Sequence, residues 1–200
     1  MDQIAKLNSK VIPLILEPTF KILSPLLIVN QSRILSVPRE TRRYGAYPRQ
    51  TLDIYSPLAG FTGSTPIVIF LYGGGLTRGD KILTDIPQSL IYHNLGTFFP
   101  LRSFTIIIPD YRRVGDPKVG TGEGATYPSG GEDVAAVLEW LHSASYPLQS
   151  LNKQHDVFIV GNSAGEVCIW QPTYLMYGLK AGGNNCLMDL ARIGCEKQYY

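Results

Sequence analysis

A serine between two glycines follows directly after an apolar run. The segment reads GNSAG at positions 161–165, and the run before it is Val157–Val160. Because glycines have no Cβ, they allow a sharp strand-to-helix turn, which lifts the Ser163 hydroxyl clear of a sheet. A helix that begins there has free N–H groups and a positive dipole end, and both stabilise a developing oxyanion. The pattern predicts a nucleophilic serine; the alternative is an ordinary glycine-rich turn.

A second glycine-rich segment follows another apolar run. Pro66–Leu71 is followed by YGGG at positions 72–75. Three consecutive glycines expose backbone N–H groups that can point into a site and hold a negatively charged oxygen. The alternatives are a flexible turn or a loop that cradles a phosphate. No Gly-Lys-Ser/Thr follows and no G-x-G-x-x-G occurs, so the sequence argues against a nucleotide site.

Taken together, these segments resemble the α/β-hydrolases, near the hormone-sensitive-lipase-like and kynurenine-formamidase-like esterases. That family shows an H-G-G-G or H-G-G-x loop, then an aspartate–tyrosine–arginine stretch, then G-x-S-A-G. This chain reads LYGGGLTRGDK at 71–81, PDYRR at 109–113 and GNSAG at 161–165, and YPSGGEDVAAVLEWL at 127–141 resembles the helix before the nucleophile strand. The resemblance covers about residues 45–165. Tyr72 stands where many relatives have histidine.

The resemblance implies an α/β-hydrolase fold, a mostly parallel sheet with flanking helices, of which the chain holds the N-terminal part while the C-terminal strands are absent. It also implies a carboxylesterase-like or lipase-like serine hydrolase. Ser163 would be the nucleophile, and the N–H groups of Ala164 and of Gly73 or Gly74 would hold the oxyanion. The expected substrate is a small ester or amide, whose acyl chain length the sequence does not reveal.

Other residues near these motifs receive different expectations. Asp110 and Arg112 are expected to stabilise loops rather than to take part in chemistry. The resemblance implies no cofactor and no metal. The three cysteines (Cys168, Cys186 and Cys195) lack the spacing of a zinc site and have no histidine near them.

The residues that would activate the serine do not follow it. A serine hydroxyl needs a general base, and the resemblance implies the order serine, acid, histidine. The histidines (His93, His142 and His155) all precede Ser163. His155 would start the strand that Ser163 follows, about 26 Å away, and the other two belong to helices that lead to that far edge. Asp189 follows Ser163 so closely in the sequence that the nucleophile helix and a loop barely fit between them, so we do not expect it to be the triad acid. The alternative function is therefore a catalytically inactive fragment or pseudoenzyme that acts as a binding or interaction protein.

The chemistry needs a sheet that brings both glycine segments to one edge. Continuous apolar runs predict strands buried on both faces. The predicted strands are Leu52–Tyr55, Pro66–Leu71, Phe104–Ile108 and Val157–Val160. Leu83–Gly96 and Glu132–His142 predict helices, the second because its apolar residues recur at helical spacing. Alternating strands and helices indicate an α/β domain with its chemistry at the carboxyl ends of the strands.

Composition limits the class of protein. The chain has 200 residues, which is about one domain, and 44% are hydrophobic and 17% charged. These values exclude a disordered, collagen-like or coiled-coil protein. The net charge of +2 is too small to argue for nucleic acid. Three cysteines, an odd number without a secretory framework, favour a reduced, cytoplasmic setting.

We expect three parts: an N-terminal arm or partial cap at 1–33, the hydrolase core at 34–165 and an atypical tail at 166–200. Residues 11–29 are apolar, but three prolines and two charges interrupt them, so they predict a packed arm rather than a spanning helix. Contact with a membrane surface is the alternative. The chain begins Met-Asp, without the basic start of a signal peptide.

The tail differs in composition from the rest of the chain. It holds all three cysteines, and Pro172 falls inside the expected nucleophile helix. The hypothesis is that the resemblance ends abruptly at Gly165, and that the later residues come from a retained intron, a frameshift or a truncated gene model. Without later strands, Val157–Val160 would form a bare apolar edge, which predicts marginal stability, aggregation or a partner that covers it.

Overall fold

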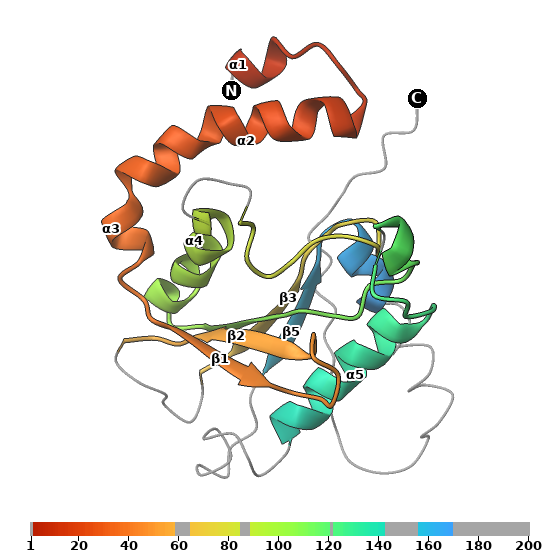
Figure 1. Cartoon of the computed structure of the whole chain (residues 1–200). Coiled ribbons are helices and arrows are strands. Elements are labelled where there is room, and N and C mark those ends of the chain that lie inside the picture. Colours follow the sequence, from red (N-terminus) through yellow and green to blue (C-terminus); the bar gives the residue numbers. More distant parts are fainter. Residues whose placement is uncertain (1, 59–64, 85–88, 121, 143–155, 170–200) are drawn as a thin grey trace.

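The described residues form a five-stranded mixed sheet with helices on both sides (Figure 1). The computed structural model describes residues 2–58, 65–84, 89–120, 122–142 and 156–169. The strands are β1 (Arg39–Arg43), β2 (Thr51–Tyr55), β3 (Ile67–Leu71), β4 (Thr105–Pro109) and β5 (Val157–Gly161). The helices are α1 (Asp2–Ala5), α2 (Ile12–Val29), α3 (Gln31–Ile34), α4 (Leu90–Phe98) and α5 (Ser129–His142), with short 3-10 helices η2 (Pro100–Arg102) and η3 (Pro117–Val119).

The order of the strands places the glycine-rich segments beside each other. The order is β1-β2-β4-β3-β5; β1, β2 and β4 pair antiparallel, and β3 pairs parallel with both β4 and β5. The register joins Leu71 to Gly161, the last residues of β3 and β5. Since both strands end at the same row, Tyr72 and Asn162 leave the sheet side by side at its carboxyl edge.

The four predicted strands are confirmed as β2 to β5, with ends that shift by one residue. β1 was not predicted, because all its residues are polar or charged and exposed. It joins the sheet through backbone pairing with β2 rather than through an apolar face. As a result, the described sheet has an antiparallel part and a parallel part.

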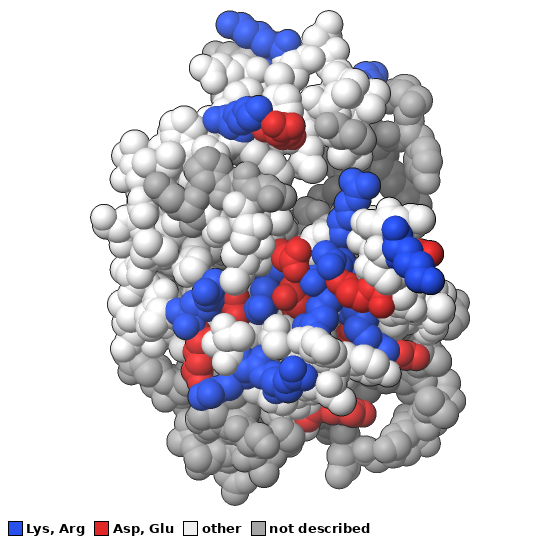
Figure 2. All heavy atoms as spheres, in the orientation of Figure 1, with Lys and Arg blue, Asp and Glu red and all other residues white. Residues whose placement is uncertain are grey.

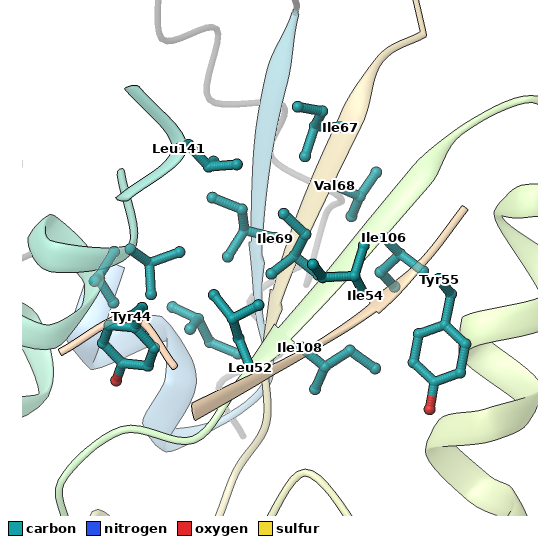
Figure 3. Packing of buried hydrophobic residues seen from close by; sticks show 14 of the residues in the cluster. Tyr44, Leu52, Ile54, Tyr55, Ile67, Val68, Ile69, Ile106, Ile108 and Leu141 are labelled. Atoms are coloured by element: carbon teal, nitrogen blue, oxygen red, sulfur yellow. The ribbon is translucent and has the colours of Figure 1, made fainter. Parts of the chain in front are cut away.

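The core lies on both faces of the central strands (Figure 3). Every residue of β4 is buried, as the continuous apolar run predicted. On one face, Leu141 of α5 packs into the cluster; on the other, Tyr55 meets α4, where a Cβ at Gly96 would lie 2.6 Å from the Tyr55 ring. Complete burial of one aliphatic side chain of this core, such as an isoleucine of β4, stabilises the fold by about 1.5–3 kcal/mol.

Both predicted helices are present with different bounds. α5 contains the expected Glu132–His142 and begins earlier, at Ser129. α4 begins at Leu90, later than expected, and continues to Phe98; residues 85–88 of that prediction lie outside the described part. A further helical segment follows Ser163, over residues 164–169.

The N-terminal arm forms a long helix, α2, that packs less than expected. Most of its large apolar side chains are exposed, Ile12 at 68% and Val29 at 84%, and α2 lies across the top of α4 in Figure 1. A pocket of about 350 Å³ is lined by residues of α2, α3, α4 and η2. In the described residues, no helix is both long enough and apolar enough to span a bilayer. Contact of residues 11–29 with a membrane surface stays a prediction, which flotation with vesicles tests.

The expectations for the tail fall on residues 170–200, outside the described part. They concern Pro172, Cys186, Asp189 and Cys195. Among the described strands, β5 pairs with β3 alone. A partner at the other side of β5 therefore stays a prediction.

Candidate active site

The turn after β5 holds Ser163 in a strained conformation. β5 ends at Gly161, residues 164–169 are helical, and the φ angle of Ser163 is +53°. A non-glycine residue in this left-handed region costs about 1–3 kcal/mol, and such strain is concentrated at functional positions. Ser163 is exposed, whereas Ala164 directly after it is buried. The turn therefore presents the serine to solvent, as the sequence predicted.

Both glycines of the turn are required by close backbone contacts. A Cβ at Gly165 would lie 2.2 Å from the carbonyl oxygen of Leu71, and one at Gly161 would lie 2.6 Å from the nitrogen of Glu166. The Asn162 N–H donates to the same Leu71 oxygen at 2.9 Å. The helix after Ser163 is thereby pressed against the end of β3, where the second glycine segment begins.

Gly73 lies against the serine. A Cβ at Gly73 would lie 2.9 Å from Asn162 Oδ1 and 3.1 Å from Ser163 Cβ. Gly74, with φ +152°, leaves no room for a side chain either, because a Cβ there would lie 2.0 Å from the Arg78 carbonyl oxygen. The fold thus brings together the predicted Gly73, Ser163 and Ala164, with Gly74 next along the loop. Backbone N–H groups at these positions can face an oxygen atom of a group bound at Ser163.

His93 lies at the opposite edge of the sheet. Its ring packs edge-on against Tyr55, with ring centroids 5.4 Å apart. Tyr55 pairs with Ile106 near the start of β4, and that row of the sheet continues to Phe158. β5 runs about 10 Å beyond Phe158 before the turn that holds Ser163, and β4 and β3 separate the Tyr55 strand, β2, from β5. Burial lowers the pKa of His93.

His142 is also remote from the serine. α5 begins beside the helix that follows Ser163, where a Cβ at Gly130 would lie 2.7 Å from Cys168 Sγ. His142 is the last residue of α5, about 20 Å along the helix axis. Its Nδ1 lies 2.7 Å from the Leu138 carbonyl oxygen. His155 lies outside the described residues.

Tyr72, the departure from the family pattern, is buried in a hydrogen-bonded network. Its hydroxyl donates to Asp110 Oδ1 at 2.6 Å and accepts a hydrogen bond from Arg49 Nη2 at 2.8 Å. Its ring stacks on Tyr111 at 5.0 Å, and the Tyr111 hydroxyl donates to the Tyr72 carbonyl oxygen at 2.8 Å. Burial and the nearby Asp110 carboxylate raise the pKa of Tyr72 well above its usual value. Tyr72 is therefore a neutral anchor for the start of the glycine loop.

Asp110 and Arg112 hold loops, as expected. The Asp110 carboxylate accepts a hydrogen bond from the Lys81 backbone N–H at 2.7 Å, in addition to that from Tyr72. Arg112 Nε donates to Asp133 Oδ1 at 2.9 Å, which ties the segment after β4 to α5. Asp110 therefore holds the two ends of the glycine-rich segment, whereas Arg112 holds the segment after β4 against α5.

The network also contains Arg49, which sequence reasoning missed. Acidic and basic side chains gather in the middle of the face of the molecule that Figure 2 shows. Arg49 Nη1 lies 2.8 Å from Asp80 Oδ1 and 3.5 Å from Glu123 Oε1. No local motif marks Arg49, because its partners come from distant parts of the chain. Among the described residues, no cluster of His, Cys, Asp and Glu could hold a metal ion.

The comparisons with known proteins agree with this architecture. The family model described as BD-FAE matches residues 52–168, more than half of the chain. The match includes both glycine segments and reaches Cys168, beyond the Gly165 at which we expected the resemblance to end. No curated protein matches the chain.

Several solved esterases share the fold. Esterase Est22 has a TM-score of 0.56 and 14% identity over 88% of this chain and 50% of its own. Esterase B from Lactobacillus rhamnosis, inhibited by a tributyrin phosphonate, has a TM-score of 0.51 and 22% identity over 85% of this chain and 55% of its own. A hyperthermophilic esterase from the archaeon Pyrobaculum calidifontis has a TM-score of 0.50 and 16% identity over 81% of this chain and 47% of its own. The chain spans about half the length of these structures.

Proposed function

Because the chain belongs to the BD-FAE family and has an α/β-hydrolase fold, we propose that it is the serine-bearing part of a carboxylester hydrolase, with Ser163 as the nucleophile. The observation that supports this most directly is the strained, exposed Ser163 with Gly73 packed against it. A strained left-handed serine at a strand-to-helix turn is typical of a nucleophile elbow. The solved neighbours are esterases, and this favours an ester over other acyl substrates.

The proposed reaction uses the carboxyl edge of the sheet. Ser163 Oγ attacks the acyl carbon, its proton passes to a general base, and the carbonyl oxygen becomes an oxyanion. The N–H groups of Ala164 and of Gly73 or Gly74 stabilise that oxyanion; loss of one such donor typically costs about 2.7–4 kcal/mol. The base then gives the proton to the leaving alcohol; in the second half, a water that loses a proton to the base attacks the acyl-serine, and the base returns the proton to Ser163 Oγ as the acid leaves.

A second candidate function rests on the positions of the described histidines. Neither His93 nor His142 lies near enough to Ser163 to take its proton. A chain without a base would bind acyl groups at the same edge without attacking them, because a serine hydroxyl is a weak nucleophile unless a base takes its proton. This is the catalytically inactive binding protein that the sequence also allowed.

The proposal includes the setting expected from the sequence. The substrate would be a small ester or amide, and no cofactor would be needed. A cytoplasmic location, expected from the three cysteines, is part of the same proposal.

Hydrolysis of a short-chain p-nitrophenyl ester, together with labelling by a fluorophosphonate, tests the proposal. Ser163→Ala is the active-site variant. Ser103→Ala is the matched control, because Ser103 is also an exposed serine with a positive φ angle, +63°, but it precedes β4 at the far edge. Circular dichroism shows whether each chain is folded.

We expect the unmodified chain and Ser103→Ala to be labelled and Ser163→Ala to be unlabelled. Turnover that depends on Ser163 supports the hydrolase. Labelling without turnover shows a reactive Ser163 whose acyl-enzyme is not released, and it argues against the binding protein, whose serine has no base to activate it. A folded chain with neither labelling nor turnover contradicts a nucleophilic role for Ser163.

A further inference from the structure

Arg49 donates hydrogen bonds to oxygens from two separate segments. It lies between β1 and β2, and its side chain is 12% exposed. Its Nε donates to the Tyr111 carbonyl at 2.7 Å and its Nη1 to Asp80 Oδ1 at 2.8 Å. Its Nη2 donates to the Tyr72 hydroxyl at 2.8 Å and to the Gly79 carbonyl. Since a guanidinium presents five N–H groups in a fixed plane, one side chain can hold all four oxygens in place.

Three of these acceptors bracket the glycine loop, residues 73–79. Tyr72 directly precedes the loop, Gly79 is its last residue, and Asp80 follows it. The two ends of the loop are in contact, because a Cβ at Gly79 would lie 2.6 Å from the Gly73 carbonyl oxygen. Arg49 therefore closes the base of the loop.

The charge of Arg49 is balanced within the network. Asp110 Oδ1 lies 3.5 Å from Arg49 Nη2, and the same oxygen accepts hydrogen bonds from the Tyr72 hydroxyl and from the Lys81 N–H. Asp80 contributes a second carboxylate. A buried guanidinium that has both charge partners and hydrogen-bond acceptors is stable where an unpaired one is not.

The other side of the loop touches the serine. Gly73 directly follows Tyr72, whose hydroxyl oxygen Arg49 holds. Gly73 also lies so close to the serine that a Cβ on it would be 3.1 Å from Ser163 Cβ. A shift at the base of the loop therefore moves the Gly73 N–H relative to the serine.

We propose that Arg49 is a positioning residue that fixes the glycine loop against Ser163, so that the N–H group of Gly73 or Gly74 meets the acyl oxygen. The part of this proposal that concerns the acyl oxygen rests on the proposed function. Arg49 acts through the loop and touches neither the serine nor the acyl group. Lysine cannot replace it, because a single ammonium on a flexible stem does not reach four acceptors in one plane.

Arg49→Lys in the full chain tests the proposal, with Arg112→Lys as the matched control. Arg112 is similarly buried, with its side chain 17% exposed, but it holds Asp133 and Glu132 of α5 rather than the loop. The first readout is amide hydrogen exchange of residues 72–81, measured by mass spectrometry. The second is the split between kcat and KM for a p-nitrophenyl ester, together with the rate of fluorophosphonate labelling.

We expect Arg49→Lys to accelerate exchange across residues 72–81 by about ten-fold, because at least one charged hydrogen bond is lost. The rate of labelling and kcat fall by about ten-fold or more, while KM changes little, since oxyanion contacts act in the transition state. Arg112→Lys leaves exchange of residues 72–81 unchanged.

Exchange of residues 72–81 that is unchanged in Arg49→Lys, or equally raised in Arg112→Lys, overturns the proposal. A fall in kcat without faster exchange also overturns it, because the effect would not pass through the loop. If the unmodified chain neither hydrolyses nor labels, the proposed function fails, and exchange still decides the role of Arg49 in the loop. Should Arg49→Lys unfold, Asp80→Ala removes one half-exposed acceptor from the loop end, and the same exchange is expected to rise by about two- to three-fold.

Discussion

Gly73 and Ser163 come from different strands and lie against each other at the carboxyl edge of the sheet. A Cβ at Gly73 would be 3.1 Å from Ser163 Cβ. The contact follows from the register, since Leu71 pairs with Gly161 and both strands end at that row. The sheet therefore sets the distance between the predicted nucleophile and the predicted oxyanion loop.

Gly73→Ala should reduce ester hydrolysis or fluorophosphonate labelling by about 100-fold, comparable to the loss of one oxyanion donor. The added methyl group would press on Asn162 Oδ1 and Ser163 Cβ and push the loop away. Gly75→Ala is the control, because a Cβ there meets nothing within 4 Å, although its φ angle of +64° makes the variant slightly strained. Equal losses in both variants would contradict a specific role for Gly73.

Gly165→Ala should destabilise the fold by about 1–3 kcal/mol, because its Cβ would overlap the Leu71 carbonyl oxygen and overpack the contact between helix and strand. Urea unfolding followed by circular dichroism measures this. Gly120→Ala serves for comparison, since a Cβ there meets open space at a positive φ of +75°. If the two variants unfold at the same urea concentration, the contact at Leu71 is not as tight as described.

Asp53→Asn should become more stable, relative to the unmodified chain, as the pH rises. Burial raises the pKa of Asp53 and outweighs the lowering effects of the Thr41 hydrogen bond and of Lys81 and Arg39. A carboxyl with a raised pKa binds more protons in the folded chain, so its contribution to stability is full below the unfolded pKa and declines as the pH rises through the folded pKa.

Urea unfolding from roughly pH 4 to pH 7 measures this difference, because the window begins near the ordinary pKa of an aspartate. The gap in the free energy of unfolding between Asp53→Asn and the unmodified chain should widen in favour of Asn across that range. A gap that narrows would mean that Lys81 and Arg39 lower the pKa of Asp53 after all.

Cys168 should resist alkylation in the folded chain. The residue is 1% exposed, and burial raises the pKa of its thiol to about 11. The thiolate is the reactive form, so iodoacetamide at pH 8 should modify Cys168 slowly. Mass spectrometry of peptides from native and urea-treated chains compares the two rates. Equal rates in both would show that the helix after Ser163 does not pack as described.

The sequence predicted the elements that carry an apolar signal and missed those that do not. β2 to β5 are continuous apolar runs, but β1 is polar along its whole length, and only its backbone pairing with β2 places it in the sheet. Likewise α4 begins later than its apolar pattern suggested, at Leu90.

The residues of the candidate site also differ in whether a local sequence pattern predicts them. Ser163 and the glycine loop could be found locally, because turns of that shape need glycines at fixed spacing. Arg49 could not, since two of its four acceptors are backbone carbonyls and all four are brought to it by the sheet order. Charged residues whose partners lie far away in the chain have no periodic pattern that would reveal them.

The contact between Gly130 and Cys168 makes two distant positions share one small volume. A Cβ at Gly130 would lie 2.7 Å from Cys168 Sγ, where the start of α5 meets the helix that follows Ser163. Enlargement of position 130 would displace that helix, and with it the Ala164 N–H. Substitutions at the two positions are therefore coupled: Gly130→Ala should be tolerated far better together with Cys168→Ala than alone. A larger residue at position 130 of α5 therefore requires a smaller one at position 168 of the other helix, and the effects of the two substitutions on stability are not additive.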